Sequence, residues 1–148
     1  MQKIISISLC FFFFTACSGL FISHDENLAG KEALQFVNKA FVDRDLDSAY
    51  ALLAQDTKTS ISLQKVKDTT VQMHPALYPT SVQAQDFEPI PGQKAMSIYV
   101  VGENGDEKFY YRIIMSGTSE TGYKPAGFFR DNGPQPRTKL MQKLEPPQ

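Results

Sequence analysis

The sequence predicts an α+β domain in which three N-terminal helices pack on a curved antiparallel sheet of about four strands. Apolar residues recur at helical spacing between residues 28 and 73, and the period of the pattern changes to two from Ser81 onward. The chain of 148 residues has an ordinary globular composition, with 42% hydrophobic and 21% charged residues. Its length therefore allows one domain with one modest core.

The net charge limits the classes of partner. The formal charge of the chain is −1 at pH 7. A domain that binds nucleic acid usually carries a basic surface and a strongly positive charge. We therefore expect no nucleic-acid partner.

The first sixteen residues are typical of an export signal. Met1 and Lys3 supply positive charge, and residues 4–14 form an apolar run of eleven residues. A helix of that length covers about 16 Å, roughly half of a bilayer core. The run is therefore too short for a membrane span and fits the hydrophobic part of a signal peptide, residues 1–16.

The segment TACSG, residues 15–19, resembles the lipobox of bacterial lipoproteins. In that family the signal is removed before the cysteine, which becomes the new N-terminus and carries acyl chains. The resemblance therefore implies lipidation of Cys17. The sequence departs from the family pattern at Phe14, where leucine is most common. The alternative is a plain secretory signal that is cut elsewhere.

The use of cysteine supports the lipoprotein prediction. Cys10 lies inside the signal, so Cys17 would be alone in the mature chain and could form no internal disulfide. An unpaired thiol is unusual in an exported protein unless lipid already occupies it. Acyl chains contribute about 0.8 kcal/mol per buried methylene, so several of them anchor a protein stably. Ser18 is unlike the aspartate of inner-membrane lipoproteins, so we expect a lipid anchor in the cell envelope, facing the periplasm, with the outer membrane favoured.

Helices are expected after a short polar tether, residues 17–27. The first helix starts near Leu28 and carries its apolar face on residues at helical spacing: Ala29, Ala33, Phe36, Val37, Ala40 and Phe41. The Asp-Arg-Asp segment at 43–45 ends this helix, and Asp45 is the expected N-cap of a second helix. A third helix should run from Ser60 to Met73 and end before Pro75, because the residue before proline avoids the helical region.

Four strands are expected over residues 81–88, 94–102, 107–115 and 123–130. Asn104-Gly105 between the second and third strands favours a type I′ hairpin turn, which needs positive φ angles. Pro125 lacks an amide donor, so the fourth strand should lie at an edge or contain a bulge. A short closing element is expected at 138–144 and a disordered tail at 145–148, which leaves residues 28–144 as the folded domain.

The order of these elements is similar to that of the NTF2-like (cystatin-like) α+β cone superfamily. Residues 36–53, FVNKAFVDRDLDSAYALL, resemble the first helix, acidic break and second helix of that group, and residues 109–129 resemble its last long hairpin. The resemblance implies a cone that often encloses a pocket between the helices and the concave sheet. In such a pocket we expect Tyr99, Tyr111 and Phe128 to contact an apolar ligand.

Residue types that bind metals or carry catalysis are scarce. His24 and His74 are the only histidines outside the signal, and no pair of them or of cysteines has a metal-ligand spacing. We therefore expect no metal, no cofactor and no catalytic residue. The aspartates at 43, 45 and 47 are explained by helix termination, capping and the helix dipole.

A small isomerase- or cyclase-type enzyme of the cone family is the first alternative. It would use Asp86 and His74 as acid and base, with Tyr99 or Tyr111 as phenol donors. A carboxylate and a histidine that point into an enclosed cavity would favour it, whereas an interior filled by apolar side chains would count against it.

The expected function is a non-catalytic binding module on a lipid anchor. It would bind a partner protein across the sheet face or a small apolar ligand inside the cone. A structural subunit that dimerises through the sheet is the second alternative. A large flat apolar sheet face would favour a partner protein or a homodimer.

Overall fold

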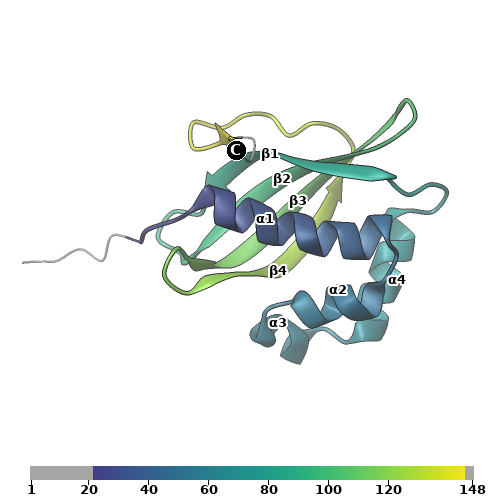
Figure 1. Ribbon diagram of the computed structural model, residues 1–148, viewed down its shortest axis with the longest axis horizontal. Coiled ribbons are helices and arrows are strands. Elements are labelled where there is room, and N and C mark those ends of the chain that lie inside the picture. The colour runs from purple at the N-terminus through teal and green to yellow at the C-terminus, as the bar shows by residue number, and fades with distance from the viewer. Residues whose placement is uncertain (1–21, 146–148) are drawn as a thin grey trace, which may run out of the picture.

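The computed structural model describes residues 22–145, in which helices precede and pack on an antiparallel sheet (Figure 1). The predicted α+β class and the order of helices before strands are confirmed. Cys17, the predicted export signal and residues 146–148 lie outside the described residues.

The first helix crosses one face of the sheet and packs its apolar side chains into the core. Helix α1 (Glu26–Val37) begins at Asp25, whose carboxylate accepts a hydrogen bond from the Leu28 N–H at 2.9 Å. This cap places the start of the helix slightly earlier than predicted. The helix continues directly into a π-helical segment, η1 (Asn38–Val42). The whole predicted apolar face is buried: Ala29, Ala33, Phe36, Val37, Ala40 and Phe41.

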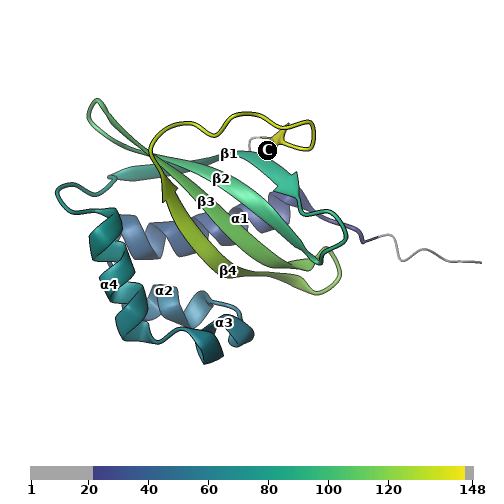
Figure 2. The same ribbon diagram turned by 180° about the vertical axis from the view of Figure 1, so that it is seen from behind.

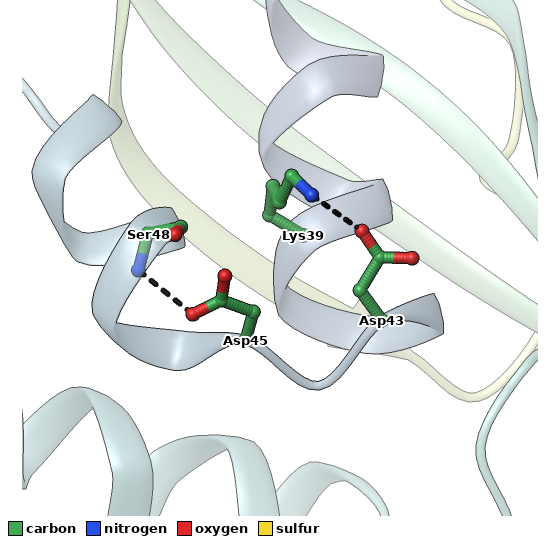
Figure 3. Close-up of polar contacts among 4 residues, drawn as sticks. All are labelled: Lys39, Asp43, Asp45 and Ser48. Carbon is green, nitrogen blue, oxygen red and sulfur yellow. Dashed lines mark hydrogen bonds and ion pairs between the residues drawn. The ribbon is translucent and has the colours of Figure 1, made fainter.

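The acidic segment between the first two helices ends one helix and starts the next (Figure 3). Lys39 pairs with Asp43 at 2.7 Å, and Arg44 takes the left-handed conformation with a φ of 59°. The Asp45 carboxylate accepts a hydrogen bond from the Ser48 N–H at 3.1 Å and caps helix α2 (Leu46–Leu52). The predicted cap at Asp45 is confirmed.

The predicted third helix starts after Ser62, so its predicted start at Ser60 is wrong, and a short helix that was not predicted precedes it. Helix α3 (Gln55–Ser60) ends at Ser60, and helix α4 (Leu63–Met73) starts after Ser62, whose hydroxyl accepts from the Lys65 N–H at 3.2 Å. Ile61 lies between them in an extended conformation. Its carbonyl accepts a hydrogen bond from the Tyr50 hydroxyl at 2.9 Å, which fixes the break. Helix α4 ends at His74, before Pro75, as predicted.

The sheet has five strands in the order β4-β3-β2-β1-β5. The strands are β1 (Ser81–Pro89), β2 (Ala95–Asn104), β3 (Glu107–Thr118), β4 (Gly122–Asp131) and β5 (Gln142–Lys143). Helix α1 lies across one face, called the inner face here, whereas no helix covers the opposite, outer face (Figures 1 and 2). Strand β4 is at an edge, and its pairing with β3 shifts register next to Met115, the partner of Pro125, so the prediction for Pro125 is confirmed.

The hairpin turn between β2 and β3 differs from the prediction. Asn104 pairs with Glu107, so Gly105-Asp106 form the turn. Gly105 has a φ of 60°, and among non-glycine residues of the described chain only Arg44 has a positive φ. A positive φ at the first central position alone is the pattern of a type II′ turn. The predicted type I′ turn centred on Asn104-Gly105 is therefore wrong by one residue.

The last segment crosses the outer face of the sheet as a strap, residues 132–144 (Figure 2). It must cross because β4 and β5 lie at opposite edges. Arg137 in the strap donates to the Asp86 carboxylate at 2.7 Å, and the Thr138 hydroxyl donates to Glu88 at 2.6 Å. Met141 is 8% exposed and covers part of the outer face. The predicted closing element is thus present as β5 and the strap that leads to it.

Replacing Gly105 by valine should lower the free energy of unfolding by about 1–2 kcal/mol, because a β-branched residue is strained at positive φ. A Cβ at Gly105 would meet no atom within 4 Å, so steric overlap adds nothing to the cost. Gly133→Val is the matched control, since its surroundings are equally open and its φ is not positive. Denaturant unfolding of both variants measures the difference, and equal stabilities would contradict the turn.

Candidate functional site

A buried histidine–tyrosine pair lies beneath the inner face of the sheet. His74 is the C-cap of α4 and is 3% exposed, and Tyr111 stands in the middle of β3 and is 2% exposed. The Nε2 atom of His74 is 2.7 Å from the Tyr111 hydroxyl, and Nδ1 is 3.0 Å from the Thr70 carbonyl oxygen. A carbonyl only accepts, so Nδ1 carries a hydrogen, and in the neutral ring Nε2 accepts from the Tyr111 hydroxyl. The two contacts fit a neutral imidazole.

Aromatic rings enclose the imidazole of His74. The Tyr78 ring stacks on it at 4.4 Å between centroids, and the Phe41 and Phe109 rings lie at 4.8 and 6.1 Å. Two guanidinium groups pack on the rings of this cluster. Arg44 lies 4.6 Å from the Tyr78 ring, and Arg130 lies 4.8 Å from the Phe109 ring and donates to the Met73 carbonyl. The cluster thus has the packing of a core and a rim of positive charge.

This environment favours the neutral forms of both members of the pair. Burial lowers the pKa of His74, and the positive charges of Arg130 and Arg44 act in the same direction, against the hydrogen bond to Thr70. Burial also raises the pKa of the Tyr111 hydroxyl. Proton transfer from Tyr111 to His74 would create two charges in an apolar site, which is unfavourable.

The structure does not bring Asp86 to this histidine. Asp86 pairs in register with Tyr99, which alternates with the buried Ile98 and Val100, so both side chains belong to the outer face. The carboxylate of Asp86 is held by Arg137 of the strap at 2.7 Å. His74 lies under the opposite, inner face. The two titratable groups of the enzyme alternative are therefore on opposite faces of the sheet.

The three residues predicted to contact a ligand are also divided between the faces. Tyr111 and Phe128 point into the core, where Phe128 packs on Phe36 with 5.4 Å between ring centroids. Tyr99 points outward, and its hydroxyl donates to Glu88 at 2.7 Å. Burial, followed by the hydrogen bond to Glu88, raises the pKa of Tyr99 to about 12. Ligand contact by these residues stays a prediction, but the side chains of Tyr99 and Tyr111 lie on opposite faces of the sheet.

Side chains fill the space between α1 and the sheet. The largest buried ones, each no more than 2% exposed, are Phe36, Phe41, Met96, Ile98, Phe109, Tyr111, Ile113 and Met115. Two hollows among the described residues open at the surface. One of about 730 Å³ lies where the end of α4 meets β3 and β4, and one of about 630 Å³ lies along β1.

The outer face carries a patch that the sequence prediction did not single out. Tyr99, Arg112 and Phe129 are paired across β2, β3 and β4 and form one row, flanked by Tyr110 and Ile114 of β3. Phe129 is 45% exposed, and the Arg112 guanidinium lies 5.0 Å from its ring. The Nε atom of Arg112 is buried and has no hydrogen-bond partner among residues 22–145. These five residues are called the outer patch below.

Comparison of the chain with protein-family models, with curated proteins and with solved structures finds no match. Within residues 22–145, no helix is both long and apolar enough to cross a bilayer. The same residues contain no group of three His, Cys, Asp or Glu side chains that could hold a metal ion.

Replacing Tyr111 by phenylalanine should lower the free energy of unfolding by about 1–2 kcal/mol, because the buried Nε2 of His74 loses its hydrogen-bond donor. Tyr110→Phe is the matched control, since its side chain is on the outer face and only partly buried. That change should stay within about 0.5 kcal/mol of the parent protein. Thermal or denaturant unfolding measures both, and an equal effect of the two changes would contradict a structural role for the pair.

Proposed function

We propose that this chain is a lipoprotein of the cell envelope, anchored through Cys17 and facing the periplasm, whose domain is a non-catalytic binding module. The domain is of the NTF2-like type, and it captures a partner protein through the outer patch. The anchor is in the outer membrane in preference to the inner membrane. Two observations support this proposal: the lipobox-like segment around Cys17 and the side chains of the outer patch.

The filled interior supports a binding role over a catalytic one. An isomerase or cyclase of the cone type needs room for substrate beside a titratable group. Phe36, Phe41 and Tyr111 occupy the space between α1 and the sheet, and none is more than 2% exposed. His74 is enclosed and neutral, and Asp86 is bound by Arg137 on the other face. The same packing argues against a ligand inside the cone.

We choose the outer patch as the partner-binding surface because Phe129 is exposed beside Arg112. Phe129 is 45% exposed on a sheet face that no helix covers. Aromatic and arginine side chains are enriched among the residues that dominate binding energy at interfaces. Arg112 lies 5.0 Å from the Phe129 ring, so the two side chains offer a partner a preformed apolar and cationic surface.

Replacing Cys17 by serine should abolish incorporation of radioactive fatty acid and leave an uncleaved or soluble exported form. The reason is that the thiol is the acceptor of the lipid in the lipobox family. Labelling of cells with palmitate, followed by recovery of the protein, measures the effect. Cys10→Ser is the matched control and should keep full labelling, whereas labelling of the Cys17 variant would contradict the anchor.

Replacing Phe129 by alanine should lower the yield of a photo-crosslinked partner at least about tenfold, the effect of losing about 1.4 kcal/mol of interface energy. The crosslinking residue is placed at Ser116, which is exposed on β3 of the outer face. Val71→Ala is the matched control, because Val71 is 59% exposed but lies on α4, away from the outer patch. Mass spectrometry of adducts from intact cells identifies the partner.

Equal adduct yields in the Phe129 and Val71 variants would contradict a binding role for the outer patch. An adduct with a second copy of the chain would show that the protein forms a homodimer through this face. A defined turnover by purified protein that is lost in Asp86→Asn would overturn the non-catalytic role.

A further inference from the structure

The start of the described chain is fastened to the hairpin that joins β3 and β4. The Ser23 carbonyl accepts hydrogen bonds from the Ser119 N–H and hydroxyl at 3.1 and 3.2 Å. The Tyr123 hydroxyl accepts from the Asp25 N–H at 2.8 Å and lies 3.2 Å from Nδ1 of His24. The rings of His24 and Tyr123 stack, and Tyr123 is 2% exposed. These five residues are called the N-terminal clamp.

The clamp lies at one end of the sheet. The β3–β4 turn is at this end, and so is the β1–β2 turn, because the Gly117 N–H donates to the Lys94 carbonyl at 2.8 Å. The β2–β3 turn at Gly105-Asp106 is at the other end, close to Tyr78, whose carbonyl accepts from the Asn104 side chain at 2.8 Å. Figure 1 shows α1 starting at one end of the sheet and the β2–β3 hairpin projecting from the other.

The chain between Cys17 and the clamp is short compared with the sheet. Ser23 follows Cys17 by six residues. Six residues span at most about 20 Å when fully extended. Strand β3 has 12 residues, and a strand of that length covers about 40 Å. A lipid on Cys17 therefore keeps the clamp end of the sheet within about 20 Å of the bilayer surface, whatever path the linking residues take.

The surface at the clamp end suits a hydrated lipid headgroup layer. The two turns present small or polar exposed residues, among them Gly92, Gln93 and Thr121, with one lysine, Lys94, and one glutamate, Glu120. Of the exposed large apolar side chains of the described residues, Val71, Leu77 and Phe129 lie away from this end, whereas Leu140 lies in the strap close to Glu88, near the end of β1. The two turns themselves can therefore rest near headgroups of either charge, with Leu140 as one exposed apolar side chain near them.

We infer that the β1–β2 turn (residues 90–94) and the β3–β4 turn (residues 119–121) form the membrane-facing surface of the domain. The β2–β3 hairpin and the C-terminal end of α4 then project away from the bilayer. The outer patch stands along the side of the domain, where a partner can reach it without displacing lipid. This inference rests on the proposed lipidation of Cys17.

Energy transfer from the domain to the bilayer surface tests this orientation. The full acylated protein is reconstituted into phosphatidylcholine vesicles that carry an acceptor dye on the headgroups. A donor dye is attached at Glu120→Cys in one sample and at Asp106→Cys in another, both at exposed turn positions. Transfer should be at least about twofold more efficient from position 120, because the two ends of the sheet differ by about 40 Å.

A longer tether is the matched control. Twenty Gly/Ser residues inserted before Ser23 should remove most of the difference between the two positions, because a flexible linker no longer limits the distance. Equal transfer from both positions in the parent tether, or stronger transfer from position 106, would overturn the orientation. If the protein still floats with the vesicles, that result would contradict the orientation but not the lipid anchor. Protein that neither carries lipid nor floats would overturn the anchor and the orientation together.

Discussion

Packing of one helix into the concave face of the sheet is the constraint on which the other features depend. Phe36 and Phe41 of α1 and η1 occupy the space over Tyr111 and Ile113 of β3, and all four are at most 2% exposed. Fully burying a side chain of this size contributes about 1.5–3 kcal/mol. Close packing of this kind leaves no interior room for a substrate. The polar groups in the interior must therefore satisfy one another, as His74 and Tyr111 do.

The filled interior also determines which surface remains for binding. One face of the sheet is used by α1, the β1 edge is partly used by β5 and the strap, and the β4 edge is contacted by α3 through the Ala54 N–H and the Pro125 carbonyl. The part of the outer face around Phe129 is left. Phe129 is 45% exposed there, and an exposed apolar side chain on an uncovered sheet face favours the proposed partner site.

Features that depend on neighbours in the sequence could be predicted, whereas features that depend on distant contacts could not. The Asp45 cap and the edge position of Pro125 follow from local chemistry, and both predictions are confirmed. The break at Ile61 depends on the Tyr50 hydroxyl, which comes from the preceding helix. The observed turn lies one residue later than the predicted one. The Asn104 side chain donates to the Tyr78 carbonyl, a contact distant in sequence that keeps Asn104 in β2.

The candidate site shows the same division. His74 and Tyr111 are 37 residues apart, and no local pattern relates them. By contrast, the placement of Tyr99 and Tyr111 on opposite faces of the sheet could be predicted from the sequence. The predicted turn pairs Tyr99 with Tyr110, and the observed register, two residues away, pairs Tyr99 with Arg112. Side chains alternate with a period of two, so both registers place Tyr99 on the face opposite Tyr111.

The account depends most on His74 being an enclosed, neutral core residue and not an accessible acid or base. An NMR titration of the imidazole in the folded protein tests this directly. The account predicts that Nδ1 carries the hydrogen and that the ring remains mostly neutral at pH 6.5, the ordinary pKa of histidine, because burial lowers the pKa. A ring that titrates with a midpoint at or above 6.5 would contradict the closed interior.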